Sequence, residues 1–142
     1  MSMMELILNL QADQTETTRL QAALDQFAAQ CSLSEEVSFK LNLVLDELIT
    51  NAISYGLNTV VQPEIHVRIT LDQDYAYVCL RDNGQAFDPF SEAPEPDIDA
   101  ALEQRRIGGL GVHFVRSMMD TCHYQREGEW NVITMTLGLN DQ

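Results

Sequence analysis

The sequence predicts an α+β fold, a two-layer α/β sandwich in which helices cover one face of a mixed, mostly antiparallel sheet. Segments with strand and helix periodicity follow one another in the order β, α, α, β, β, α, β, β. The later strands are joined in pairs by short turns, which argues against a doubly wound parallel sheet, whose strands alternate singly with helices. With 142 residues, 45% of them hydrophobic, the chain suits a single domain over residues 1–142.

The first half of the chain is predicted to hold one strand and two helices. Residues 4–10 are a short apolar run bounded by polar residues, which is typical of a strand. The next segment shows apolar residues at helical spacing, on a face formed by Leu20, Ala23, Leu24, Phe27 and Ala28. Ser34, followed by two glutamates, indicates the start of a second helix that stops at Tyr55 and Gly56.

The second half is predicted to hold four strands and one helix. Residues 64–72 alternate apolar and polar side chains, and residues 75–84 form the second arm of a hairpin. Residues 82–104 contain three of the four prolines and neither Lys nor Arg, so a lid or binding loop is expected there. Helical spacing returns in residues 110–120, and a hairpin over residues 124–139 closes the chain. Its last strand has one face of Val132, Thr134 and Thr136 and another of Ile133, Met135 and Leu137.

The chain is strongly acidic, with 22 Asp and Glu against 8 Lys and Arg and a formal charge of −14. Such a charge repels phosphate backbones and anionic lipid headgroups, so neither nucleic acid nor a membrane is an expected partner. A bound polyanion would need local compensation by a divalent cation, backbone amides or arginines. The three cysteines show no metal-binding spacing and the N-terminus shows no signal-peptide pattern, which together favour a cytoplasmic protein.

A carboxylate and an amide lie one turn apart on the second predicted helix. At about 100° per residue, Glu47 and Asn51 stack on the shoulder of the apolar stripe, whereas Asp46 and Thr50 fall on the far side. One interpretation is that the pair is the polar border of an amphipathic helix. The other is that both oxygens address one Mg²⁺-phosphate group, because Mg²⁺ usually takes only one or two hard oxygen ligands from protein.

The stretch RDNGQAFDP, residues 81–89, follows a predicted strand. Asp82 can point its carboxylate into a pocket while Gly84 lets the backbone turn tightly beside a ligand. A carboxylate in a pocket would recognise a hydrogen-bond donor such as an exocyclic amine, and would not hold a phosphate. Because Asp-Asn-Gly is also a common turn, a purely structural role is the alternative.

The stretch RRIGGLGVHFV, which begins at Arg105, has the pattern of a glycine-rich helix entrance. Gly108, Gly109 and Gly111 would present backbone amides at the positive end of the helix dipole, with Arg105 and Arg106 as local cations. A steric reason for the glycines is the alternative. The pattern is not a Walker A loop, which needs Gly-Lys-Ser/Thr, nor a Rossmann motif, which directly follows a strand.

In order and spacing, these motifs resemble the GHKL-type (Bergerat) ATP-binding fold, and within it the stand-alone serine kinases that act as anti-sigma factors in bacterial partner switching. ELITNAISYG resembles the N box of that family, RDNGQAFDP its first glycine box and GGLGVHFVRSMMD its second. WNVITMTL resembles the closing strand, which carries an adenine-contacting Thr. The likeness covers residues 5–138, nearly the whole chain.

The resemblance implies a role for each matching position. Glu47 would be the base that orients or deprotonates the attacking hydroxyl, and Asn51 would ligate a Mg²⁺ ion that bridges the ATP phosphates. Asp82 would hydrogen-bond the adenine amino group, with Gly84 allowing close approach. Thr134 would support the same adenine edge, directly or through water.

The phosphate side of the implied site comes from the second glycine box. Its nucleotide-binding positions are Gly108, Gly109, Leu110 and Gly111, whose backbone amides would face the phosphates. Arg105 or Arg106 would neutralise charge on the transferring group, as sites of this kind accelerate transfer mainly by positioning and charge stabilisation.

Two features depart from the common family pattern. Ala86 stands in the first glycine box where many relatives have a second glycine, a form that this subgroup tolerates, so it is kept among the nucleotide-binding positions. The ATP lid, expected over about residues 88–107, contains no glycine and carries several acids, which disfavours phosphate binding unless the acids face outward.

The resemblance implies an ATP-dependent serine/threonine protein kinase, with ATP and Mg²⁺ as cofactors, that phosphorylates a STAS-type anti-anti-sigma partner. A sigma factor or another output regulator would be the rival partner, and a homodimer is a further expectation because relatives are often dimers. One alternative is an ATP-gated binding module without significant kinase activity, which would not need a base at Glu47. Another is the detached catalytic domain of a histidine kinase.

Overall fold

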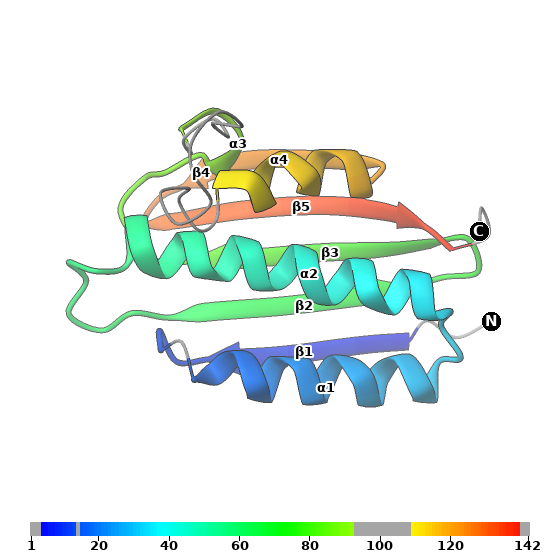
Figure 1. Cartoon of the computed structure of the whole chain (residues 1–142). Helices are drawn as coiled ribbons and strands as arrows, with labels where there is room; N and C mark the ends of the chain where they lie inside the picture. Colours follow the sequence, from blue (N-terminus) through cyan, green and yellow to red (C-terminus); the bar gives the residue numbers. More distant parts are fainter. Residues whose placement is uncertain (1–3, 14, 93–108, 140–142) are drawn as a thin grey trace, which may run out of the picture.

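In a computed structural model, which describes residues 4–13, 15–92 and 109–139, five strands form one sheet with helices on one of its faces (Figure 1). The strand order is β1-β2-β3-β5-β4, and every pairing is antiparallel. The strands are β1 (Met4–Leu10), β2 (Ile65–Leu71), β3 (Tyr75–Asp82), β4 (Thr121–Glu127) and β5 (Trp130–Gly138). The predicted α+β sandwich is confirmed, with the refinement that the described sheet holds no parallel pair.

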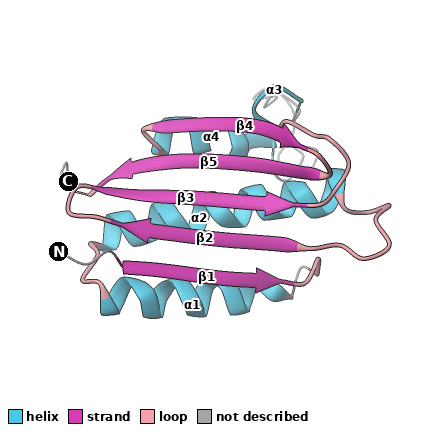
Figure 2. Cartoon of the chain, turned by 180° about the vertical axis from the view of Figure 1, so that it is seen from behind, coloured by secondary structure: helices cyan, strands magenta, loops and turns pink. Residues whose placement is uncertain are grey.

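The helical layer consists of three longer helices and two short turns. They are α1 (Glu16–Gln30), α2 (Glu35–Asn51), the π-helical turn η1 (Ala52–Gly56), α3 (Pro89–Glu92) and α4 (Gly109–Met118). Seen from the opposite side, the sheet lies in front of the helices and its second face carries no helix of the described chain (Figure 2). None of the helices in the described ranges is long and apolar enough to cross a membrane.

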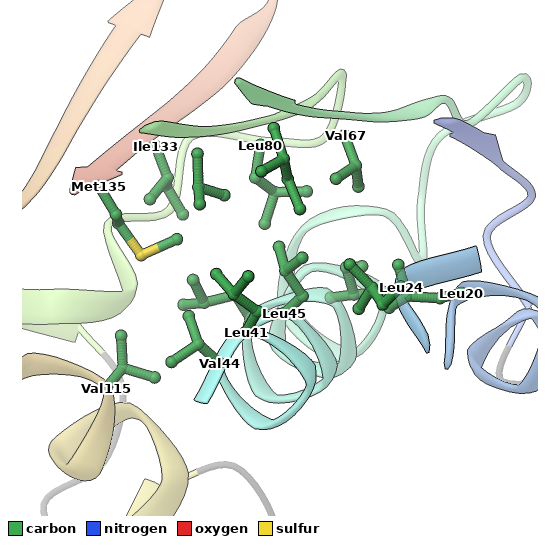
Figure 3. Packing of buried hydrophobic residues seen from close by; sticks show 14 of the residues in the cluster. Leu20, Leu24, Leu41, Val44, Leu45, Val67, Leu80, Val115, Ile133 and Met135 are labelled. Carbon is green, nitrogen blue, oxygen red and sulfur yellow. The ribbon is translucent and has the colours of Figure 1, made fainter. Parts of the chain in front are cut away.

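The core lies between the sheet and the three longer helices (Figure 3). Alternate residues of the strands point into it, which is why the period-two pattern of the sequence maps onto one buried face. Each fully buried Leu or Val stabilises the fold by roughly 1.5–3 kcal/mol relative to an exposed position. The labelled core residues come from all three helices and from the sheet: Leu20, Leu24, Leu41, Val44, Leu45, Val67, Leu80, Val115, Ile133 and Met135.

The second helix begins where the sequence predicts and ends differently. Ser34 caps α2, since its Oγ accepts a hydrogen bond of 3.1 Å from the backbone N–H of Val37. The regular α-helix ends at Asn51 and continues as the wider turn η1, closed by a bond of 2.9 Å from the N–H of Leu57 to the carbonyl of Ala52. π-Turns of this kind are frequent at functional sites.

Other predicted boundaries shift by a few residues. The last helix ends at Met118 and β4 already begins at Thr121, so the closing hairpin is longer than predicted. The one-turn helix α3 lies inside the segment predicted as a loop. Residues 93–107, which are most of the expected lid, lie outside the described residues.

The antiparallel register puts the start of the first glycine box at one end of the sheet. Asp82 pairs with Ile65 on one side and Asn131 on the other, while Met4 and Gly138 lie at the opposite end. The ends of the described chain are therefore remote from the first glycine box.

Candidate functional site

Asp82 is a buried carboxylate at the end of β3. Its side chain is only 5% exposed, and its Oδ1 accepts hydrogen bonds from the backbone N–H of Gly84 (2.9 Å) and from Nδ2 of Asn131 (3.0 Å). Burial raises the pKa of Asp82, and these two bonds and the Arg126 charge offset only part of that rise. The turn after β3 is thus built around a carboxylate that the protein holds at a desolvation cost.

Asn131 on β5 ties that turn to the sheet. It is 3% exposed, and its Nδ2 also donates to the carbonyl of Gln85 at 3.0 Å. Its Oδ1 accepts from the N–H of Phe87 at 3.2 Å and from the hydroxyl of Tyr124. These bonds use both ends of the amide and fix its orientation. Asn131 is not among the site residues predicted from the sequence, although it lies two residues before Ile133 on the inward face of β5.

Thr134 does not lie beside Asp82. Side chains alternate across a strand, and Thr134 is exposed on the face opposite to that of Ile133 and Met135. Its neighbours in the sheet are Cys79 and His123. The prediction that Thr134 supports the adenine edge with Asp82 is therefore wrong for this chain, and the β5 residue that contacts Asp82 is Asn131.

Two glycines bring the end of the α2 segment against the turn after β3. A Cβ on Gly84 would lie 2.6 Å from the carbonyl oxygen of Gly56, so only glycine fits there without a shift of the backbone. The same oxygen accepts a 2.9 Å hydrogen bond from the N–H of Gln85. Beside it the rings of Tyr55 and Phe87 stack, with centroids 5.1 Å apart and planes 19° apart. The predicted close approach at Gly84 is thus made to the protein's own backbone.

Glu47 and Asn51 carry oxygens that have no hydrogen-bond donor. Among the residues that the structure describes, Oε2 of Glu47 and Oδ1 of Asn51 are the two buried side-chain atoms without a partner. Asn51 is 1% exposed, and its Nδ2 donates to the carbonyl of Glu47 at 2.9 Å, which turns Oδ1 away from the helix backbone. Burial, and then the charge of Asp46, raise the pKa of Glu47.

This pair fits a hydrated cation that is already bound to an anion. A buried oxygen without a hydrogen-bond partner costs about 1–3 kcal/mol of folding free energy. Two such oxygens one turn apart on the same helix therefore indicate a binding site for a ligand. A carboxylate and an amide oxygen are the hard donors that Mg²⁺ takes from protein when phosphates and water complete its shell. In the described ranges, no group of three or more His, Cys, Asp and Glu could hold a metal ion.

The second glycine box forms the beginning of α4. Gly109 is the first residue of this helix, and Leu110 and Gly111 belong to its first turn, so backbone amides lie at its N-terminus as predicted. Val112 and Val115 are buried in the core between α4, α2 and the sheet. Arg105, Arg106 and Gly108 lie outside the described residues. Ala86, in the first box, is exposed.

The comparisons with known proteins agree with this geometry. Residues 10–137 match the model of the histidine kinase-like ATPase domain. The chain is 30% identical to the serine/threonine-protein kinase BtrW of Bordetella bronchiseptica over 129 residues, 89% of this chain and 90% of that protein. It is 28% identical to the anti-sigma F factor of Bacillus licheniformis over 94 residues, 66% of this chain and 64% of the relative.

A solved structure shares the fold. The crystal structure of the RsbU and RsbW domains of Rv1364c from Mycobacterium tuberculosis superposes with a TM-score of 0.68 at 15% identity, over 94% of this chain. The chain spans about a third, 32%, of that longer protein. The predicted enzyme class agrees with the name of the Bordetella relative. The predicted GHKL resemblance is confirmed, and the chain belongs to the histidine kinase-like ATPase domain family.

Proposed function

We propose that this chain is an ATP-dependent serine/threonine protein kinase of the anti-sigma type, acting in the cytoplasm on a STAS-domain anti-anti-sigma protein. The observation that carries the proposal is the pair of buried, unpartnered oxygens on Glu47 and Asn51. A metal-phosphate site needs the oxygen of Asn51, but only a transfer reaction needs a second, basic oxygen one turn away. The names of the relatives as kinase and anti-sigma factor support the same reading.

In the proposed reaction, each residue has a separate task. Asp82 accepts a hydrogen bond from the adenine amino group, an assignment supported by the fact that both bonds described above end on its other oxygen, Oδ1. Backbone amides at the start of α4, from Gly109 to Gly111, hold phosphate oxygens. Asn51 would hold Mg²⁺, whose chemistry when bound is to neutralise phosphate charge.

Glu47 is the base in this proposal. The acceptor hydroxyl attacks the γ-phosphorus, a new O–P bond forms, and the bond to the bridging oxygen breaks so that ADP leaves. The hydroxyl proton passes to the carboxylate of Glu47. Burial raises the pKa of this group, which makes it a better proton acceptor than an exposed glutamate.

The test mixes the purified protein with γ-labelled ATP and the STAS-domain protein encoded in the same genome. We expect label on a Ser or Thr of the acceptor, and Glu47→Ala should lower the transfer rate about 1,000-fold while ATP affinity stays within about threefold. Glu36→Ala is the matched control, since Glu36 is an exposed residue of the same helix that forms an ion pair with Lys40.

Two results would contradict the proposal. If the wild-type chain binds ATP and the acceptor but transfers no label, the chain is a nucleotide-gated binding module. If label appears on His, the chain acts as a histidine kinase domain instead.

A further inference from the structure

Two adjoining hollows lie between α1 and α2, and they are lined by other residues than those of the site described above. One has a volume of about 420 Å³ and the other about 380 Å³. Both are lined by Gln21, Phe39 and Asn42, so they form one groove along the two helices, called here the α1–α2 groove. None of its residues belongs to the ATP site.

An aromatic side chain, that of Phe39, lines both parts of this groove. Phe39 is 61% exposed although it lies on α2, whose other apolar side chains pack mostly into the core. Leu20 and Leu43 line the same hollow beside it. Large exposed aromatic side chains within a concave apolar surface are typical of contact sites for a partner protein.

The groove carries negative charge only. Asp25, Glu35 and Asp46 are among its lining residues, and these include neither Lys nor Arg. Its shape is held by the protein itself, since Nδ2 of Asn42 on α2 donates to Oδ1 of Asp25 on α1 at 3.3 Å. A segment that combines an apolar side chain with Lys or Arg would match both the aromatic centre and the acidic walls.

The groove runs toward the catalytic shoulder of α2. Leu43 lines it and lies four residues before Glu47, so the two side chains are about one helical turn, roughly 6 Å, apart along the axis. Asp46, at this end of the groove, directly precedes Glu47. A protein seated here would have its nearest residues beside the proposed base.

We propose that the α1–α2 groove is the docking site of the phosphoacceptor protein, which inserts an apolar side chain against Phe39 and places basic side chains opposite Asp25, Glu35 and Asp46. This rests on the proposed kinase function and names how its protein substrate is held. Docking at the groove brings the acceptor hydroxyl to Glu47, while ATP is held by residues that the acceptor does not contact.

The test measures the affinity of the full chain for the STAS-domain protein of the same genome by titration calorimetry, together with steady-state phosphorylation. We expect Phe39→Ala to raise both the Kd and the KM for this acceptor about tenfold or more, with kcat and the KM for ATP unchanged. Tyr75→Ala is the matched control, an aromatic residue of 42% exposure on β3 that should leave both values as they are.

A charge variant tests the acidic walls. Asp25→Lys should weaken acceptor binding and reduce its dependence on salt, whereas Asp74→Lys, in the turn before β3, should do neither. Thermal unfolding of each variant separates docking from stability, because loss of acceptor affinity at an unchanged Tm cannot come from unfolding.

The outcomes separate the groove from the kinase proposal. If the wild-type chain transfers phosphate and the Phe39 and Asp25 variants keep its KM for the acceptor, the groove is not the docking site, although the kinase function stands. If the wild-type chain binds the acceptor without transfer, and Phe39→Ala weakens that binding, the docking site holds while the kinase function fails. Absence of any binding to the acceptor would overturn both.

Discussion

The two ends of the candidate site differ in how complete they are without a ligand. Around Asp82, Asn131 and the backbone of Gly84 satisfy one carboxylate oxygen and fix the turn. On the shoulder of α2, Oε2 of Glu47 and Oδ1 of Asn51 have no donor at all. At the first end the protein itself supplies hydrogen-bond donors to the carboxylate, whereas at the second end the described residues supply none to these two oxygens.

The two ends also differ in how they affect the stability of the free protein. The hydrogen-bonded network around Asp82 keeps its geometry before binding, although the buried carboxylate is held at a desolvation cost. Unpartnered buried oxygens destabilise the free protein, and a ligand that supplies their partners recovers that free energy on binding. Substitutions at the two ends should therefore change affinity and stability in different proportions.

The largest effect is expected at Asn51. Asn51→Ala removes the buried oxygen, so affinity for Mg²⁺-ATP should fall about 100-fold or more, while the Tm of the free protein changes little because an unsatisfied group is lost. Titration calorimetry with and without Mg²⁺ measures this, with Asn42→Ala on the same helix as control. An unchanged Mg²⁺ dependence in the Asn51 variant would show that the metal is held elsewhere.

A smaller loss of affinity is expected for Asp82→Asn. The amide can still accept through its oxygen from Gly84 and Asn131, but its own N–H₂ would face the adenine amino group, so ATP affinity should fall about 30-fold. Because the adenine amino group is the proposed partner, discrimination between ATP and inosine triphosphate should disappear in the same calorimetric series. Retained discrimination would remove Asp82 from adenine recognition.

The same variant should be more stable than the wild-type protein near neutral pH. Burial raises the pKa of Asp82 in the folded state, so its contribution to the free energy of unfolding is full below the ordinary pKa and is lost as pH rises through the raised value. Denaturant titrations between pH 4.5 and 8 should therefore show a gain for Asp82→Asn that shrinks as pH falls. A gain that stays constant with pH would rule out the buried charge as its source.

The contact between the two glycines predicts an effect on stability. Gly84→Ala should destabilise the fold by about 1–3 kcal/mol, because its Cβ would lie 2.6 Å from the carbonyl oxygen of Gly56. Gly56→Ala is the matched control from the same contact, since the nearest atom to its Cβ would be at 3.5 Å. Equal effects of the two substitutions in urea unfolding would show that the backbones do not press against each other.

The smallest effect concerns the pH profile. The charge of Asp46 contributes, after burial, to the raised pKa of Glu47, so Asp46→Asn should move the acidic limb of kcat toward lower pH by less than about one unit. Initial rates between pH 5 and 8 at saturating ATP test this. A shift toward higher pH would show that another group controls the limb.

The sequence predicted the fold because the fold depends on local patterns, whereas the roles of the site residues stay predictions. Strand alternation and helix capping at Ser34 predicted the layers, and the motifs around Glu47, Asp82 and Gly109 predicted which parts of the chain meet. The π-turn after Asn51 could not be predicted from the sequence, because apolar residues continue at helical spacing through it.

Asn131 and Thr134 show where a sequence pattern is insufficient. The alternation along β5 already separated the two faces of this strand, but the resemblance pointed to a Thr, and the residue on the correct face is Asn131. Only the register that pairs Asp82 with Asn131 reveals this, because strand pairing over 49 positions in sequence is set by the packed sheet and not by local composition.

The strand order has a practical consequence. Since Met4 and Gly138 lie at the end of the sheet remote from Asp82, a tag or a second protein joined through either strand would project away from the nucleotide and the first glycine box. A fluorescent label attached there should report binding without interfering with it, and in a longer polypeptide the same domain could be exchanged as a unit with its site left accessible.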